Sequence, residues 1–137
     1  MKTSARNELS GKIIEVKSGE VMSEVKVEIA PSVIVSATIT KEATKSLELI
    51  EGIEVSALIK SSSVIISKEQ LKATARNVIK AEIVEIISGQ VNSEIKLKVG
   101  ENMICSVITN EAVKDLDLTK GSIAYAIFKA SSVILVA

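Results

Sequence analysis

A short segment that combines a hydroxyl group, a guanidinium group and an amide occurs twice in the chain. It is Thr3-Ser4-Ala5-Arg6-Asn7 near the start and Ala73-Thr74-Ala75-Arg76-Asn77 seventy positions later. A lysine followed by small residues also recurs, as Lys60-Ser61-Ser62 and Lys129-Ala130-Ser131. Arginine and lysine supply two positive charges, and hydroxyls and main-chain N–H groups supply hydrogen bonds. This set suits a tetrahedral dianion, which is strongly disfavoured when it is buried without such partners.

The same residues also have structural interpretations. Arg6 and Arg76 can each form a salt bridge with one of the many glutamates, and serine-rich segments are common because serine suits turns. The residues by themselves leave both interpretations open.

Other kinds of chemistry have little support in the sequence. The chain has no histidine, one cysteine and two aspartates, Asp115 and Asp117. It therefore lacks the usual general base near neutral pH and the usual transition-metal ligands. It also lacks a phosphate-binding glycine–lysine loop and a dinucleotide fingerprint. Lys and Arg balance Asp and Glu at 17 each, which argues against a nucleic-acid or membrane surface. Catalysis is not expected.

The recurring motifs belong to a repeat that covers nearly the whole chain. Ser4–Ala30 matches Thr74–Gly100 at 11 of 27 positions, and Val33–Lys68 matches Asn102–Ala137 at 14 of 36. The identical pairs include Glu24 with Glu94 and Lys26 with Lys96. This level of identity indicates duplication. We therefore expect two tandem domains, 1–67 and 68–137. Domains of this size are only marginally stable alone, so we expect them to pack against each other or against other chains.

Each repeat is expected to be a small β-barrel with one short helix. The alternation of apolar and charged residues predicts strands, and Thr40 and Thr109 are expected to cap the helices. In the first repeat the expected elements are strands over Glu8–Ser18, Val21–Ile29, Val33–Ile39, Glu54–Lys60 and Val64–Ser67, with a helix over Lys41–Leu47; the second helix is expected over Asn110–Leu116. This order is typical of an OB-like five-stranded barrel, with a plain sandwich as the alternative. The fold class is therefore all-β.

The composition also bears on the core and the compartment. Tyr125 and Phe128 are the only aromatic residues, so the core must be built from Ile, Val, Leu and Ala. Cys105 is expected to be a small core residue. The start of the chain has no apolar signal-like region and no apolar run is long enough to span a membrane, so the cytoplasm is the expected compartment.

Four motifs, in the same order in both copies, resemble a known family. In the first copy they are Thr3–Asn7, Gly19–Val25, Ile39–Ala43 and Lys60–Val64; in the second they are Thr74–Asn77, Gly89–Glu94, Ile108–Ala112 and Lys129–Val133. This pattern is similar to the Mop domain of the molybdate-binding proteins called molbindins. A chain with two such repeats resembles the di-Mop type.

The resemblance implies a trimer of double-domain chains that binds molybdate, and tungstate as its analogue, at interfaces between barrels. The residues that the resemblance assigns to the oxyanion are Ser4, Ala5, Arg6, Ser36, Lys60, Ser61, Ser62, Thr74, Ala75, Arg76, Cys105, Lys129, Ala130 and Ser131. It implies that Ser36 approaches the anion from a neighbouring barrel. A further site near a threefold axis would involve Val21, Met22, Ser23, Val91, Asn92 and Ser93. No direct protein–metal ligand is implied.

The two copies differ at positions that matter to such a site. Cys105 stands where the first copy has Ser36, Thr74 where it has Ser4, Ala130 where it has Ser61, and Asn92 where it has Met22. The two repeats are therefore expected to bind with unequal affinity.

The expected function is a cytoplasmic molybdate-binding protein that stores or buffers the anion for cofactor synthesis. An OB-fold nucleic-acid-binding protein is one alternative, but such proteins use aromatic platforms in a basic groove. A molybdate-sensing module that acts through a partner is another. Related regulators and transporters attach a helix-turn-helix or an ATPase domain, and neither is present in these 137 residues. Binding of a molybdenum–pterin cofactor is a third.

Overall fold

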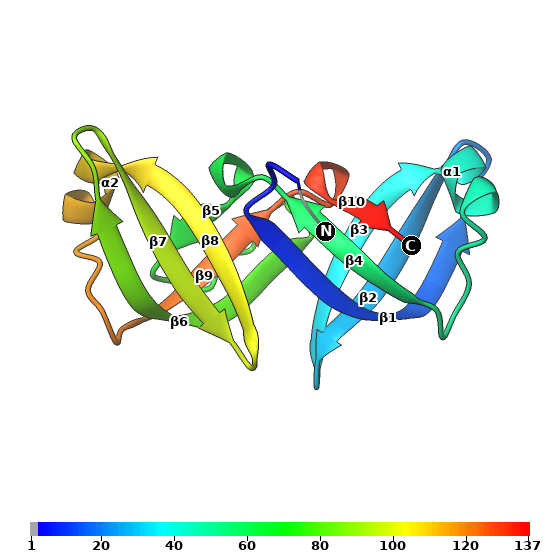
Figure 1. Ribbon diagram of the computed structural model, residues 1–137, viewed down its shortest axis with the longest axis horizontal. Coiled ribbons are helices and arrows are strands. Elements are labelled where there is room, and N and C mark those ends of the chain that lie inside the picture. The colour runs from blue at the N-terminus through cyan, green and yellow to red at the C-terminus, as the bar shows by residue number, and fades with distance from the viewer. Residues whose placement is uncertain (1–2) are drawn as a thin grey trace.

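The computed structural model describes residues 3–137 as two five-stranded curled sheets set side by side (Figure 1). Met1 and Lys2, which belong to the expected first domain, lie outside the described residues. The first repeat contains β1 (Asn7–Ser18), β2 (Met22–Ala30), β3 (Val33–Thr40), α1 (Lys41–Ser46), β4 (Glu54–Ile59), the 3-10 turn η1 (Ser61–Ser63) and β5 (Ile65–Ser67). The second contains β6 (Asn77–Ser88), β7 (Asn92–Val99), β8 (Asn102–Thr109), α2 (Asn110–Asp115), β9 (Ile123–Phe128), η2 (Ala130–Ser132) and β10 (Ile134–Val136).

The local patterns of the sequence explain these elements. In β2 the side chains of Val25, Val27 and Ile29 are buried, while the charged residues between them face outward. The hydroxyl of Thr40 accepts a hydrogen bond from the Ala43 N–H at 3.1 Å and begins α1; Thr109 begins α2 in the same way. The expected all-β class with one short helix per repeat is confirmed. No strand end of the first repeat differs from the expected position by more than one residue.

The final strand of each repeat joins the sheet of the other repeat. The strand orders are β10-β4-β1-β2-β3 and β5-β9-β6-β7-β8. Ile65 of β5 pairs with Ile127 of β9, and Ile134 of β10 pairs with Leu58 of β4. In Figure 1 the red β10 accordingly lies in the half that contains β1 to β4.

This exchange was not foreseen from the sequence. The short 3-10 turns at η1 and η2 carry the chain from one half into the other, so neither sheet is complete without the opposite repeat. The two halves are thus tied together by main-chain hydrogen bonds as well as by side-chain packing.

The core consists of aliphatic side chains from both sheets. Leu9, Val25, Val35, Ile83 and Ile104 are among the fully buried residues. Phe128 is buried as well, and Cys105 is buried as expected.

Candidate functional site

The strand register brings the repeated cationic segments together at one end of each sheet. Asn7 of β1 lies opposite Ile59 of β4, so Arg6 comes next to Lys60 and to the η1 turn that follows it. In the second sheet Asn77 lies opposite Phe128, which brings Arg76 next to Lys129 and η2. The register thus places the main chain of each arginine beside that of the lysine in the same repeat.

A buried asparagine attaches each of these segments to the other repeat. Asn7 donates from Nδ2 to the Cys105 carbonyl at 2.9 Å and accepts at Oδ1 from the Cys105 N–H at 2.6 Å. Asn77 makes the same pair of bonds with Ser36, at 2.9 and 2.8 Å. The side-chain amides satisfy main-chain groups of β8 and β3, which are edge strands of their sheets.

Two donor clusters result, each built from both repeats. The first donor cluster comprises Ser4, Ala5, Arg6, Lys60, Ser61 and Ser62 with Cys105 on the adjoining β8. The second donor cluster comprises Thr74, Ala75, Arg76, Lys129, Ala130 and Ser131 with Ser36 on β3. A further bond joins β8 to the end of η1, where the Ser106 hydroxyl donates to the Val64 carbonyl at 2.6 Å. Ser36 lies beside the second-copy segment through its main-chain bonds to Asn77.

The arginines of both clusters are paired with glutamates of the opposite repeat. Arg6 Nη2 lies 3.1 Å from Glu94 Oε2, and Arg76 Nη2 donates to Glu24 Oε2. In the single chain, Arg6 and Arg76 therefore form the salt bridges that the sequence left open as an alternative to anion binding. Because the arginine side chains are more than half exposed, the pairs contribute little to stability and leave the guanidinium groups accessible.

The cysteine distinguishes the first donor cluster from the second. Burial raises the pKa of the Cys105 thiol, and the negative charge of Glu94 raises it further, while Lys96 and Arg6 act in the opposite direction. The thiol is therefore neutral near neutral pH, and it offers a weaker hydrogen-bond donor than the Ser36 hydroxyl.

The residues expected at a threefold axis lie elsewhere. Val21 and Val91 are 71% and 69% exposed and sit beside α1 and α2, which occupy opposite outer ends of the chain (Figure 1). Ser23 and Ser93 are buried, and Ser93 donates to Asn110 Oδ1 at 2.5 Å. Within one chain, residues 21–23 therefore lie far from residues 91–93, and we call these two sets the Val21 and Val91 groups.

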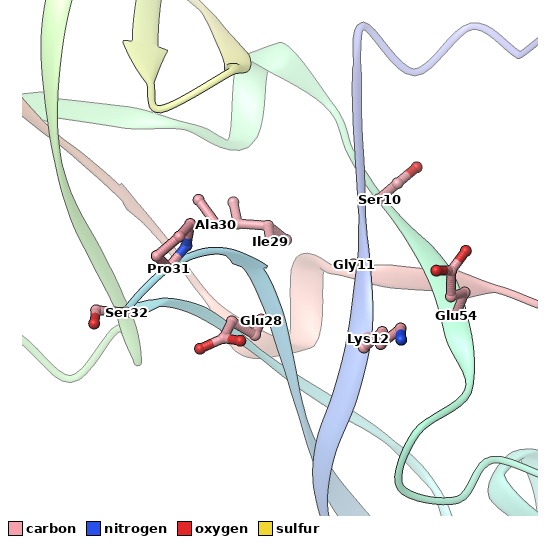
Figure 2. A pocket seen from close by; sticks show the side chains of 9 residues that line it. All are labelled: Ser10, Gly11, Lys12, Glu28, Ile29, Ala30, Pro31, Ser32 and Glu54. Atoms are coloured by element: carbon pink, nitrogen blue, oxygen red, sulfur yellow. The ribbon is translucent and has the colours of Figure 1, made fainter.

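The surface hollow shown in Figure 2 does not include either donor cluster. This open pocket of about 570 Å³ lies between the β1–β4 pair and the turn from β2 to β3. Its charged side chains are Lys12, Glu28 and Glu54, whose excess of carboxylate is unsuited to a dianion. Gly11 lies close to the main chain of β2, since a Cβ there would be 2.2 Å from the Glu28 carbonyl oxygen.

Sequence reasoning missed several residues that shape the clusters. They are the bridging Asn7 and Asn77, the ion-paired Glu24 and Glu94, and Lys26 and Lys96, which lie opposite Ser36 and Cys105 in the strand register. The residue type at each of these positions is the same in both repeats, so a comparison of the two copies could have identified them as candidates. The partners of the asparagines and the glutamates, however, lie in the opposite repeat.

No group of three or more Cys, Asp or Glu side chains in residues 3–137 is arranged to hold a metal ion. No helix in the same range is long and apolar enough to cross a membrane.

Each repeat matches the same family of known proteins. Residues 3–66 and 73–135 each match the TOBE domain. A structure of the cytoplasmic molybdate-binding protein ModG with molybdate bound has a TM-score of 0.93 and 36% identity, and the match covers 98% of both chains. Molybdenum-pterin-binding protein 3 of Clostridium pasteurianum is 44% identical over 66 residues, which are 48% of this chain and 97% of that protein.

Longer relatives match as well. The molybdenum transport protein ModE of Azotobacter vinelandii is 44% identical over an alignment of 138 positions, which covers 98% of this chain and 51% of the relative. The chain spans about half the length of this and other curated relatives that it matches. The double match to one domain model and the end-to-end match to ModG confirm the resemblance noted from the motifs. The chain therefore belongs to the TOBE domain family and carries two such domains in tandem.

Proposed function

We propose that this protein binds molybdate, with tungstate as an analogue, and stores or buffers it in the cytoplasm. The observation that carries the proposal is the end-to-end similarity to ModG, a cytoplasmic protein whose structure holds molybdate, together with the duplicated donor clusters. Each cluster offers an arginine, a lysine and several hydroxyl or main-chain donors, which is what a dehydrated tetrahedral dianion requires. The role is binding rather than catalysis.

The clusters are completed by other copies of the chain in this proposal. The side chains of Arg6, Lys60 and Ser62 are exposed, as are their counterparts in the second repeat, so one chain cannot by itself exclude water from an anion. Ile65 and Ile134 are 62% and 61% exposed at equivalent places on the two outer strands β5 and β10. An apolar surface presented twice in this way supports association into a homo-oligomer, which we propose to be a trimer.

In such a trimer, we take the repeats as 1–67 and 68–137. Each repeat supplies the arginine and the lysine of one cluster, and the other repeat supplies Cys105 or Ser36. The Val21 and Val91 groups at the outer ends would meet the same groups of neighbouring chains near the threefold axis. The change from Ser36 to Cys105 makes the two clusters unequal, and we propose that the first donor cluster binds the anion less tightly.

Calorimetric titration with molybdate tests the function, with sulfate as the smaller dianion for comparison. We expect binding to wild-type protein and loss of most affinity at the first cluster in Arg6→Ala, because the guanidinium supplies both charge and geometry. Lys60→Met should act in the same direction but more weakly. Light scattering would report the oligomeric state. The absence of heat and of thermal stabilisation at millimolar molybdate would refute the proposal.

A second candidate function is a molybdate-sensing module that acts through a partner. It is favoured by the match to half the length of ModE proteins, one of which is described as a transcriptional regulator in Yersinia pestis. Nucleic-acid binding by these residues has no comparable support, because Phe128 lies in the core and cannot stack on bases. A pull-down from cell extract with and without molybdate would separate storage from sensing: an anion-dependent partner favours sensing.

A further inference from the structure

Each arginine of the donor clusters is held by a glutamate of the opposite repeat. Arg6 Nη2 donates to both carboxylate oxygens of Glu94, at 3.1 and 3.4 Å, and Arg76 Nη2 donates to Glu24. The glutamate side chains are 19% and 20% exposed, whereas the arginine side chains are 61% and 59% exposed. The carboxylates are therefore the more fixed members of the pairs, and the guanidinium groups are the members that can move.

A carboxylate in this position opposes the binding of an anion. A dianion on the Arg6 guanidinium would lie within a few ångströms of Glu94, and like charges at that distance repel strongly where water is partly excluded. Relief of this repulsion requires the guanidinium to turn away from the carboxylate, which breaks the existing ion pair. The same reasoning applies to Arg76 and Glu24.

We propose that Glu24 and Glu94 are built-in competitors of the oxyanion, so that binding exchanges an arginine–carboxylate pair for an arginine–oxyanion pair. This inference rests on the proposed function. Lys26 and Lys96 lie two positions further along the same strands, and therefore on the same face as Glu24 and Glu94. Lys26 lies 4.0 Å from Glu15 and Lys96 lies 3.5 Å from Glu85, and each lysine can turn to the glutamate on its own strand when the arginine releases that carboxylate.

The attraction to arginine and lysine depends on the charge of the anion, whereas the cost of breaking the ion pair does not. A doubly charged tetrahedron gains enough attraction from arginine and lysine to replace the carboxylate, whereas a singly charged tetrahedron such as perchlorate gains about half as much at the same distance. Glu24 and Glu94 thus lower the affinity for both kinds of anion, and only the more strongly attracted dianion is retained.

Isosteric variants test the inference by calorimetry at fixed ionic strength. Glu24→Gln and Glu94→Gln retain the side-chain shape but remove the charge, and each should bind molybdate about tenfold more tightly at its own cluster. Perchlorate binding should tighten by no more than molybdate binding in the same variants, because the carboxylate repels a dianion at least as strongly as a monoanion. Glu54→Gln is the matched control, since it removes one exposed negative charge from β4 and should leave both quantities unchanged.

A second measurement on wild-type protein does not depend on how the variants fold. In NMR spectra, molybdate should shift the carboxylate carbon signals of Glu24 and Glu94 together with the Nε–H signals of Arg6 and Arg76. Arginine shifts without glutamate shifts would overturn the inference. So would unchanged or weaker molybdate binding in the Gln variants, which leaves the proposed function standing. No molybdate binding by wild-type protein would instead refute the proposed function itself.

Discussion

Replacement of the bridging asparagine Asn7 by alanine should strongly destabilise the fold. Asn7 is fully buried and satisfies both the N–H and the carbonyl of Cys105 on the edge strand β8. In Asn7→Ala both main-chain groups lose their partner while the surrounding residues still exclude water. A buried unsatisfied group costs about 1–3 kcal/mol, so we expect a loss of roughly 2–5 kcal/mol in the free energy of unfolding. Asn77→Ala should have a similar effect through Ser36.

The assay is urea unfolding followed by far-UV circular dichroism, because the chain has no tryptophan. Protein concentration is held constant, since association contributes to apparent stability. Asn102→Ala is the matched control: Asn102 makes one bond between the repeats, from Nδ2 to the Ile29 carbonyl at 2.8 Å, and it is only partly buried. Its loss should cost about 1 kcal/mol. If Asn7→Ala cost no more than Asn102→Ala, the view that asparagine joins the two halves would be wrong.

Three further predictions concern other parts of the chain. Gly11→Ala should cost about 1–3 kcal/mol in the free energy of unfolding, because the added methyl group would lie 2.2 Å from the Glu28 carbonyl oxygen; urea unfolding would show it, and unchanged stability would contradict it. Thr40→Ala should cost about 1 kcal/mol through loss of the α1 cap, with the outcome read from the same titration, and a change below a few tenths would count against the cap.

The third of these predictions is a pH dependence. Because the folded state raises the pKa of the Cys105 thiol, stability is retained below the thiol's unfolded pKa of about 8.5 and lost as pH rises from there through the folded pKa. Cys105→Ser should lose less stability over this alkaline range, and iodoacetamide should modify native wild-type protein more slowly than unfolded protein. Equal rates in the two states would show that burial does not protect the thiol.

Much of the fold could be predicted from local patterns. The alternation of buried Val25, Val27 and Ile29 with charged residues predicts β2 because side chains of a strand point to opposite faces in turn. Thr40 identifies the start of α1 because its hydroxyl satisfies a free main-chain N–H. These relations lie within a few residues, so they can be read without knowing the rest of the structure.

The pairing of the final strands could not be predicted in this way. The two copies contain nearly the same final strands, since Ser62-Ser63-Val64-Ile65 repeats as Ser131-Ser132-Val133-Ile134. A strand with that pattern fits β4 and β9 equally well, so its sequence does not say which sheet it joins. Only the path of the chain through η1 and η2 decides that β5 and β10 are exchanged.

For the candidate site, the sequence by itself determined the inventory: two copies of an arginine, a lysine and small hydroxyl residues, in a chain with no histidine and one cysteine. The tertiary structure decided that each copy faces the other repeat, where Asn7 meets Cys105 and Arg6 meets Glu94. The physical reason is distance along the chain. Periodicity and capping act between neighbours, whereas these contacts join residues almost ninety or more positions apart and exist only after both sheets have closed.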